Sequence, residues 1–259
     1  MQSLKASVKH LITYPIKGLS SHPLESVMLH AARGFPLDRA FAFARHDSGM
    51  DISAPRPMPK SKFLVLARDA ALARLTTHFD AASLLLTVND GAGHLTFDLS
   101  TQNGMAGASA FLAQTVGLPD DQRPNFIRGG DIRFTDVCMT SAQYMHCVSI
   151  INLASVRAFS AAIGTAVDPH RFRGNLLIDG LAPFAELEMI GHEFAVGGAR
   201  LRILKRTMRC PATQVNLQTA TRDLDVPELL HETYGHRDMG VYAEVIEGGK
   251  VHLGDEVLV

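Results

Sequence analysis

The fold is constrained most by a series of short strand-like segments that follow one another without helices between them. Four of these segments lie at about 63–68, 72–79, 83–89 and 94–99. The last two are joined by Asn-Asp-Gly-Ala-Gly at 89–93, which is typical of a β-hairpin turn. Similar segments lie at about 6–16, 25–29, 41–45, 148–151, 176–178, 184–190, 193–196, 199–204, 211–215 and 241–259. Strands this short and regular predict a β-barrel or β-sandwich rather than alternating strand and helix units.

Three segments have the composition and end signals of helices. Residues 106–116 are closed by Gly117, and Asn152 can cap a helix that continues to Ile163. Asp225 with Glu228 forms a capping box for a short helix that ends at Gly235. The Pro/Gly/Asp-rich run at 118–131 is the best candidate for a domain boundary.

Composition limits the class of protein. With 46% hydrophobic and 20% charged residues, the chain is predicted to be an ordered globular protein. A net charge of −1 excludes a globally basic nucleic-acid binder, so any anion must be bound by a local cluster. The residues at 1–9 contain no long apolar core, and no stretch of about 18 apolar residues occurs. We therefore expect a cytoplasmic protein with no membrane and no nucleic-acid partner.

Cysteine usage is sparse and points to a reducing compartment. Cys138, Cys147 and Cys210 form no CxxC pair, and their odd number argues against a disulfide framework. The segment that contains Cys138 and Cys147 ends in a predicted buried strand, which favours packing roles for both.

Cys210 stands at the end of a strongly basic segment. Five cations occupy the ten residues before it, namely Arg200, Arg202, Lys205, Arg206 and Arg209, and Pro211 then ends the regular strand. Neighbouring cations favour the thiolate, which is the form that binds metals or attacks electrophiles. The alternative is that the basic residues form a solvated edge and that Cys210 is a small buried apolar residue.

Other cations stand at turns or beside proline. Lys17 follows Tyr-Pro-Ile at a predicted strand end, where its amine should be available. Asp38 and Arg39 are adjacent at the start of the segment at 41–45, and such a neighbouring pair is most often a structural ion pair. The proline-rich segment at 53–63 must be an extended loop. Its cations, Arg56, Lys60 and Lys62, form either a solvated rim or another anion contact.

A third basic cluster precedes the segment at 176–178. If this part of the chain is extended, Arg171 and Arg173 lie on one face and suit a phosphate or carboxylate. The alternative, equally supported by these residues, is that each arginine pairs with an acidic neighbour such as Asp168 or Asp179. Asn175 follows directly.

Five short motifs, in order along the chain, resemble the MOSC family, the domain found at the C-terminus of molybdenum cofactor sulfurases and in the mitochondrial amidoxime reducing components. The motifs are Tyr-Pro-Ile-Lys-Gly, Gly-Phe-Pro-Leu-Asp-Arg, Arg-Phe-Arg-Gly-Asn, Arg-Cys-Pro-Ala-Thr and Gly-Val-Tyr-Ala with Gly-Gly-Lys-Val and Gly-Asp-Glu-Val. The resemblance implies a mainly β (α+β) protein with few short helices. It places an N-terminal MOSC β-barrel-like domain at 1–117 and the MOSC domain itself at 124–259.

The resemblance also implies a molybdenum–molybdopterin cofactor (Moco). It assigns Cys210 as the molybdenum ligand and the catalytic residue. Its cofactor-binding positions correspond to Lys17, Arg39, Arg171, Arg173, Asn175 and Arg209. Guanidinium, ammonium and amide groups suit a cofactor that carries a phosphate and a pterin rich in donors and acceptors.

The function implied is an oxidoreductase that reduces N-hydroxylated small molecules. The chain has no cysteine cluster for an iron–sulfur centre and no glycine motif for a dinucleotide, so electrons would come from a separate donor protein. A cofactor carrier or sulfur-transfer module is the alternative. A cysteine hydrolase is a third hypothesis, but no spacing selects a histidine as its base.

Overall fold

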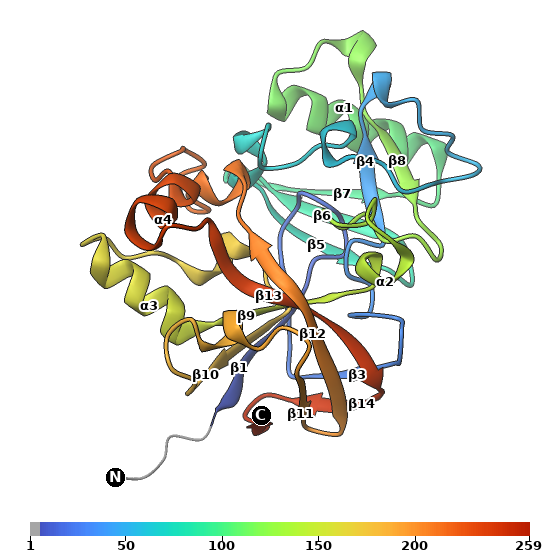
Figure 1. The fold of residues 1–259 in the computed structure, drawn as a ribbon. Coiled ribbons are helices and arrows are strands. Elements are labelled where there is room, and N and C mark those ends of the chain that lie inside the picture. The colour runs from blue at the N-terminus through green and yellow to red at the C-terminus, as the bar shows by residue number, and fades with distance from the viewer. Residues whose placement is uncertain (1–5) are drawn as a thin grey trace.

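A curled sheet of eight strands forms the larger part of the protein (Figure 1). The structure is a computed structural model that describes residues 6–259, so the first five residues of the N-terminal segment discussed above lie outside it. The strand order is β15-β11-β12-β13-β9-β10-β1-β2. The bounds are β1 Ser7–Thr13, β2 His22–Leu24, β9 Val148–Asn152, β10 Leu176–Asp179, β11 Glu193–Val196, β12 Ala199–Met208, β13 Asp238–Glu247 and β15 Val257–Leu258. All neighbouring strands are antiparallel except β9 and β10.

The first strands of the chain are built into the sheet of its C-terminal half. Strand β1 pairs with β10, and β3 (Ser26–Leu29) pairs with β14 (Gly249–His252). Buried residues from both ends of the chain form one core, which includes Val8, Leu201 and Val251. Strands β1 and β3, which precede the run at 118–131, therefore belong to the core of the C-terminal half.

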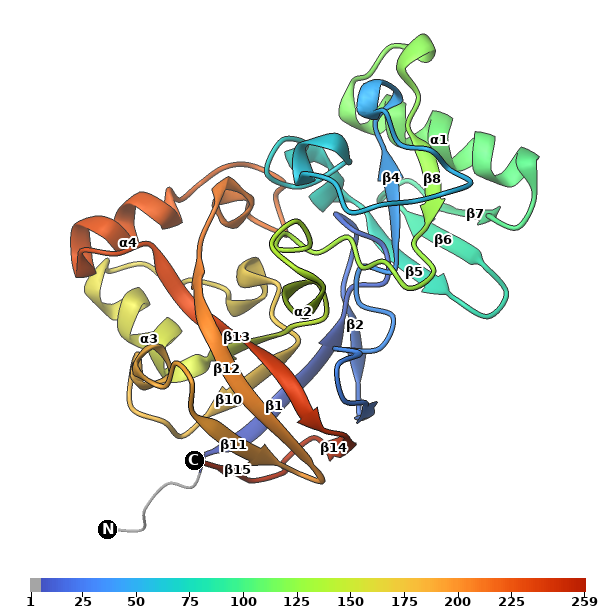
Figure 2. The same ribbon diagram turned by 45° about the vertical axis from the view of Figure 1, so that its right-hand side comes forward.

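A second body holds most of residues 41–128. It consists of the three-stranded sheet β5-β6-β7, the pair β4-β8 and helix α1 (Figure 2). The bounds are β4 Phe41–Ala44, β5 Thr76–Asp80, β6 Leu85–Asn89, β7 His94–Asp98, α1 Gln102–Val116 and β8 Asn125–Arg128. The rings of Phe41, Phe79 and Phe126 pack against one another and join these sheets. Because β8 comes from the predicted linker at 118–131, that run is partly a strand of this body.

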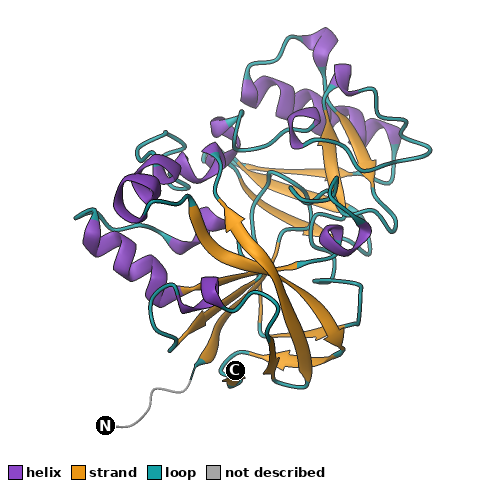
Figure 3. Cartoon of the chain, in the orientation of Figure 1, coloured by secondary structure: helices purple, strands orange, loops and turns teal. Residues whose placement is uncertain are grey.

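The few helices lie on the outside of the sheets (Figure 3). Helix α3 (Leu153–Ala162) is capped by the Asn152 side chain, which accepts from the Ala154 amide, and α4 (Val226–Tyr234) is capped by Asp225. Helix α2 (Ala142–Met145) and seven 3₁₀ helices complete the set, at His46–Ser48, Lys60–Lys62, Ala70–Arg74, Asp120–Gln122, Pro169–Phe172, Ala185–Glu188 and Pro211–Gln214. Among residues 6–259, no helix has both the length and the apolar character that crossing a bilayer requires.

The mainly β fold predicted from the sequence is confirmed, as are the three predicted helices and the hairpin at 89–93, which joins β6 to β7. Four local predictions outside the segments around Cys210 and Arg171 are wrong. The segment at 63–68 is a turn with only an isolated bridge from Phe63, because the Asp69 carboxylate binds the Val65 amide. Residues 72–75 are likewise in a 3₁₀ helix and the turn after it rather than in the strand expected at 72–79. The Gly-Gly turn at 248–249 leads into β14, which pairs with β3 instead of folding back on β13.

The segment at 184–190 is the fourth, a 3₁₀ helix that carries a buried carboxylate. Phe184 adopts a left-handed conformation with φ 62°, which starts the turn. Glu186 is 1% exposed and accepts hydrogen bonds from the Asn152 amide and the Ser155 hydroxyl. Because the buried carboxylate has these hydrogen-bond partners, the segment is held as a 3₁₀ helix, which its apolar residues alone do not indicate.

The pairing of β13 with β9 depends on Gly240. This residue has φ +75°, and a Cβ atom there would overlap the Ile150 carbonyl oxygen. We predict that Gly240→Ala lowers the free energy of unfolding by about 3 kcal/mol or more, the sum of left-handed strain and overpacking. Gly235 is the matched control, since it has the same φ and open space around it. Urea unfolding should show a loss of only about 1–2 kcal/mol for Gly235→Ala, and equal losses for the two variants would contradict the packing argument.

Candidate functional site

A cavity of about 290 Å³ lies where the two bodies meet, and we call it the first cavity. Its lining is strongly cationic although the chain as a whole has a net charge of −1. Seven cations line it, namely Lys17, Arg39, Lys60, Arg171, Arg173, Lys205 and Arg209, against the carboxylates of Asp38 and Asp136. Such a surface attracts anions.

Strand β12 and the residue that follows it place three alternate side chains at this cavity. Leu201 and Ile203 are in the core of the sheet, and the same face continues to Lys205, Thr207 and Arg209 at the cavity wall. The opposite face carries Arg200, Arg202 and Arg206, which form ion pairs with Glu247, Glu193 and Glu188. These three arginines therefore do not contribute to the surroundings of Cys210, although they precede it closely in the sequence. For them the solvated-edge alternative holds.

Cys210 lies on the wall of the first cavity, just beyond the end of β12. It is half-buried, and the Thr213 amide and hydroxyl both donate to its carbonyl oxygen, at 3.0 and 2.9 Å. Pro211 starts a 3₁₀ turn to Gln214, so the strand predicted at 211–215 is wrong. The turn removes Cys210 from the sheet and leaves its side chain at the cavity.

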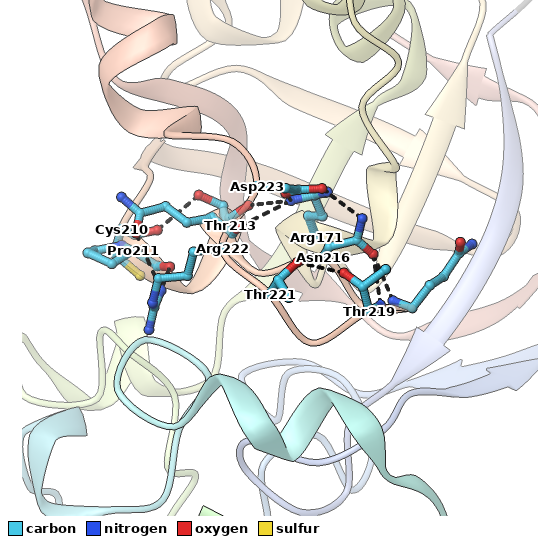
Figure 4. A network of polar contacts seen from close by, with 11 residues as sticks. Arg171, Cys210, Pro211, Thr213, Asn216, Thr219, Thr221, Arg222 and Asp223 are labelled. Atoms are coloured by element: carbon cyan, nitrogen blue, oxygen red, sulfur yellow. Dashed lines mark hydrogen bonds and ion pairs between the residues drawn. The ribbon is translucent and has the colours of Figure 1, made fainter. Parts of the chain in front are cut away.

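Arg171 holds the turn after Cys210 in place. Its guanidinium makes two hydrogen bonds of 2.7 Å to Asp223 and donates to the Gln214 carbonyl at 3.2 Å (Figure 4). An acidic partner was expected as the alternative to ligand binding, but it comes from Asp223 rather than from a sequence neighbour. The extended geometry expected for Arg171 and Arg173 is also wrong, because residues 169–172 are a 3₁₀ helix and Arg173 has φ 51°. Both side chains nevertheless line the first cavity.

Arg222 connects the Cys210 turn to the second body. One end of its guanidinium donates to the Pro211 carbonyl at 2.8 Å (Figure 4). The other end donates to the carbonyls of Leu66 and Ala67, at 3.1 and 2.8 Å. Both of these residues line the first cavity, so Arg222 sets the distance between its two walls.

Two guanidinium groups share the ring of Tyr14. Arg39 lies 4.6 Å and Arg173 4.2 Å from its centroid. Arg39 pairs with Asp38 at 2.5 Å, which confirms the expected structural ion pair, and donates to the Arg173 carbonyl at 2.9 Å. Arg173 has a buried Nη2 without a hydrogen-bond partner among the described residues. Burial and the neighbouring charge of Arg39 lower the pKa of Arg173 to about 10.

Asp136 joins two lysines at the cavity wall. Lys17 Nζ is 2.6 Å and Lys60 Nζ 3.1 Å from its carboxylate oxygens. Against the effect of burial, the two ammonium groups hold the pKa of Asp136 well below its usual range. Burial alone would lower the pKa of Lys60. The neighbouring Asp136 carboxylate and the Cys210 sulfur outweigh burial and raise the pKa of Lys60. The Lys17 amine is thus in an ion pair, in contrast to the available amine predicted from the sequence.

Asn175 and Arg209 line the cavity, but their polar groups form hydrogen bonds with backbone atoms. Asn175 accepts from the Ser149 amide at 3.0 Å and donates to the Ile12 carbonyl at 3.1 Å. Arg209 donates to the carbonyls of Met239 and Phe172, at 2.8 and 2.9 Å. Both residues hold the cavity wall together, and their contact with any ligand stays a prediction.

Among the other lining residues, Asp136, Thr207 and Tyr242 were not considered from the sequence, and Lys205 was considered only as one of the five cations before Cys210. Alternation along β12 could have revealed Thr207 and Lys205. Tyr242 lies in the Gly-Val-Tyr-Ala motif, and burial followed by the charge of Asp136 raises its pKa to about 12. No local pattern marks Asp136.

The other two cysteines are buried, as expected for packing residues. Cys138 donates to the Met58 carbonyl at 3.6 Å. Cys147 also lines the first cavity, but burial and Glu244 raise its pKa to about 12, which keeps it a neutral thiol.

Comparisons with known proteins place the chain in a family. The sequence profile of the MOSC domain matches residues 127–258, and that of the MOSC N-terminal beta barrel domain matches residues 5–123. Comparison with curated proteins gave no match.

Two solved structures resemble this chain at low identity. YUAD protein from Bacillus subtilis is 13% identical with a TM-score of 0.44, over 98% of this chain and 94% of that one. YiiM from Geobacillus stearothermophilus is 17% identical with a TM-score of 0.34, over 43% of this chain, and the match spans about half, 52%, of YiiM. The sequence profiles decide the assignment, since the MOSC domain alone covers more than half of the chain: the protein belongs to the MOSC family.

Proposed function

We propose that the first cavity binds the molybdenum–molybdopterin cofactor and that the protein is an oxidoreductase acting on N-hydroxylated small molecules. The observation that carries this proposal is the position of Cys210, a half-buried thiol on the wall of a cavity lined by seven cations. Proteins of the MOSC family are associated with this cofactor. The cofactor is anionic through its phosphate and its dithiolene sulfurs, so its charge complements this lining.

The donors around the first cavity fit such a group. Three buried polar atoms on its wall lack a hydrogen-bond partner among the described residues: Arg171 Nε, Arg173 Nη2 and Thr207 Oγ1. Buried polar atoms are rarely left unpaired, so their presence on one wall favours a polar ligand. We assign Arg173 to the phosphate and Thr207 to the pterin edge or an oxo group, with the Cys210 thiolate as the protein ligand of molybdenum.

When bound, the cofactor supplies the two-electron chemistry. For a hydroxylamine the overall reaction is R–NHOH + 2 e⁻ + 2 H⁺ → R–NH₂ + H₂O, in which the N–O bond breaks and the oxygen leaves as water. A separate donor protein would supply the electrons, because the chain's three cysteines are scattered and form no iron–sulfur motif.

The protein itself places a positive charge beside the Cys210 sulfur and fixes the position of the Cys210 side chain. Lys60 carries its ammonium group to the sulfur, and Asp136 fixes that ammonium against Lys17. A cation fixed beside the sulfur costs no reorganisation when negative charge develops nearby. The Arg222 tether keeps Cys210 at a set distance from Leu66 and Ala67, which limits what can approach it.

The first prediction from this proposal concerns the metal ligand. In protein purified from a host that makes the cofactor, Cys210→Ser should lose most of its molybdenum and its reductase activity while remaining folded, because the side chain stands on a cavity wall. Cys147→Ser is the matched control, since this thiol lines the same cavity but is kept neutral by burial. Metal analysis, pterin fluorescence and circular dichroism check this result. Equal metal contents in the two variants would contradict the role of Cys210.

Turnover separates the reductase from the alternative, a cofactor carrier or sulfur-transfer module. Loaded protein with a chemical electron donor should reduce a hydroxylamine or an amidoxime. Stoichiometric metal and pterin without turnover of either substrate would contradict the reductase assignment.

The second prediction concerns the unpaired guanidinium. Arg173→Gln should weaken pterin retention about 10- to 100-fold, the equivalent of one charge-assisted hydrogen bond of about 1.5–3 kcal/mol. Arg200→Gln is the control, because this arginine is in ion pairs on the opposite face of β12. Pterin loss during dialysis, followed by fluorescence, measures the effect. If Arg200→Gln and Arg173→Gln lose pterin at the same rate, Arg173 is not an anion partner.

The third prediction concerns Asp136 and pH. Asp136→Asn should lower the free energy of unfolding by about 1–3 kcal/mol at pH 7, because it leaves the buried Lys17 ammonium without its carboxylate. The folded-state pKa of Asp136 is depressed, so its stabilising effect is complete above the unfolded pKa of about 3.9 and declines as the pH falls below it. Urea unfolding at pH 7 and pH 3 should therefore show a smaller difference in acid.

Asp131 provides the comparison for this experiment. Its pair with Arg33 is exposed on both sides, at 92% and 69% of the side chains, so Asp131→Asn should change stability by less than about 0.5 kcal/mol. A difference between Asp136→Asn and the parent that stays constant with pH would contradict the ion-pair explanation.

A further inference from the structure

Two exposed methionines lie at the opening of the first cavity. Met208 is 73% exposed, the highest fraction among the large apolar side chains of residues 6–259, and it also lines the cavity. The cavity therefore opens to solvent beside it. Met139 is 57% exposed and follows Val137, another lining residue, by two positions. Methionine suits surfaces that bind other proteins, because its flexible thioether adapts to the surface that it meets.

The segment at 53–68 adds positive charge beside the same cavity. It has no acidic residue and four cations, namely Arg56, Lys60, Lys62 and Arg68. Lys60 and Ala67 line the cavity, and Arg68 directly follows Ala67. Arg56 and Arg68 are exposed, and neither forms an ion pair with a residue that the structure describes. These two charges are therefore available to the acidic groups of a partner.

Two contacts hold this basic segment against residues 136–139. Lys60 Nζ lies 3.1 Å from the Asp136 carboxylate, and Cys138 Sγ donates to the Met58 carbonyl at 3.6 Å. Met58 is buried, so the loop is packed against the protein at this point. The exposed methionines and the unpaired arginines therefore lie on adjoining segments around the cavity. We call these four residues the rim surface: Arg56, Arg68, Met139 and Met208.

The rim surface lies close to the place where electrons are needed. Met208 and Cys210 have Cα atoms at most about 7 Å apart, because two residues of extended chain span no more than that. A protein that covers Met208 thus comes next to the wall that holds Cys210. Protein interfaces combine an apolar centre with a charged periphery, and complementary charge speeds the encounter of the two partners. The charge of the rim surface is positive, so the matching partner is acidic.

We propose that the rim surface is the docking site of an acidic electron-carrier protein. This inference rests on the proposed function, which takes its electrons from outside the chain. With a one-electron carrier D, two reduced copies dock in turn for each substrate molecule. The balance is R–NHOH + 2 D(red) + 2 H⁺ → R–NH₂ + H₂O + 2 D(ox), in which the N–O bond breaks and the carrier is oxidised.

Calorimetric titration tests docking without any turnover. The probes are two acidic carriers, a plant-type [2Fe–2S] ferredoxin and a flavodoxin. At least one should bind, and its Kd should rise as the salt concentration increases from about 0.01 M to about 0.3 M, because salt screens the charges. Binding of neither carrier at low salt would overturn the inference.

Charge reversal then locates the surface. Arg56→Glu combined with Arg68→Glu should raise the Kd of the carrier about tenfold or more at low salt. Lys9→Glu combined with Lys250→Glu is the matched control, since it changes the net charge equally at two exposed lysines of β1 and β14 that do not line the first cavity. This control should change the Kd by less than about twofold. Equal Kd values for the two double variants would contradict the rim surface.

Met208→Gln tests the apolar part of the rim surface. Loss of its apolar contact should raise the Kd of the carrier about fivefold, as for a residue near the centre of an interface. Leu253→Gln is the control, because Leu253 is also exposed, at 46%, but does not line the first cavity. An unchanged Kd in Met208→Gln would remove the methionine from the docking site.

Turnover with a small electron donor separates this inference from the proposed function. In loaded protein, reduced methyl viologen should support equal hydroxylamine reduction by the parent and by the Arg56/Arg68 double variant, whereas kcat/KM for the reduced carrier falls in the variant. Turnover with methyl viologen but with neither carrier would overturn the inference and leave the proposed function intact. Salt-sensitive carrier binding that the double variant weakens, without turnover from any donor, would support the docking site and contradict the reductase.

Other occupants of the rim surface give different results in the same samples. Dimerisation of the parent, measured by sedimentation and abolished in Met208→Gln, would assign the surface to a second copy of this chain and overturn the inference. A fall in methyl viologen-supported turnover in the Arg56/Arg68 double variant would show that these charges serve the substrate, which would also overturn it.

Discussion

Repulsion among seven cations at one cavity is the constraint around which the site is built. Like charges this close destabilise one another unless counter-charges or oriented carbonyls hold them. Asp38 pairs with Arg39, Asp223 with Arg171, and Asp136 with Lys17 and Lys60. Arg209 is held by backbone carbonyls instead. Lys205 is exposed and lies over the Tyr144 ring. Arg173 differs from these cations, because its guanidinium has neither an ion pair nor a carbonyl partner among the described residues, and this difference directs attention to a ligand.

The cavity exists only because the two bodies are joined at defined points. Arg222 links the Cys210 turn to carbonyls of Leu66 and Ala67, and Asp136 lies between lysines that come from different parts of the N-terminal half. The pairing of β1 with β10 positions the segment after β1, so that Lys17 lies at the wall of the first cavity. A ligand that contacts both walls would therefore stabilise the junction as well as its own binding site, by the linkage that applies to any ligand of the folded state.

Local sequence was sufficient where the structure is decided locally. The caps at Asn152 and Asp225 and the hairpin between β6 and β7 were predicted correctly, because each depends on residues two to five positions apart. The predictions failed where a distant partner decides. Residues 184–190 looked like a strand, but Glu186 is satisfied by Asn152 and Ser155, more than 30 residues earlier in the chain.

The same distinction applies to the site. Cys210 was identified from the residues around it, yet three of the five cations that suggested it lie on the outer face of β12. Its cationic surroundings come in part from Lys60, which is 150 positions away and was considered only as a rim or anion contact. Arg171 and Arg173 share a motif but differ in role, because Asp223 lies 52 residues beyond Arg171 and no sequence pattern links them. The sequence showed which side chains were present. Only the fold showed which of their polar groups lack a hydrogen-bond or ion-pair partner.

Whether its polar groups already have partners decides whether a residue shapes the cavity or is available to bind a ligand. Arg171, Asn175 and Arg209 have most of their polar groups bonded to protein, so replacing them would disturb the wall before it affected any ligand contact. Tyr14, Arg173 and Thr207 keep buried polar atoms at a cost to stability. A fold that maximised stability alone would have apolar side chains at such positions. Arg173 and Thr207 line the first cavity and Tyr14 lies against the Arg173 guanidinium, and the cost is recovered only if a ligand supplies the missing hydrogen bonds.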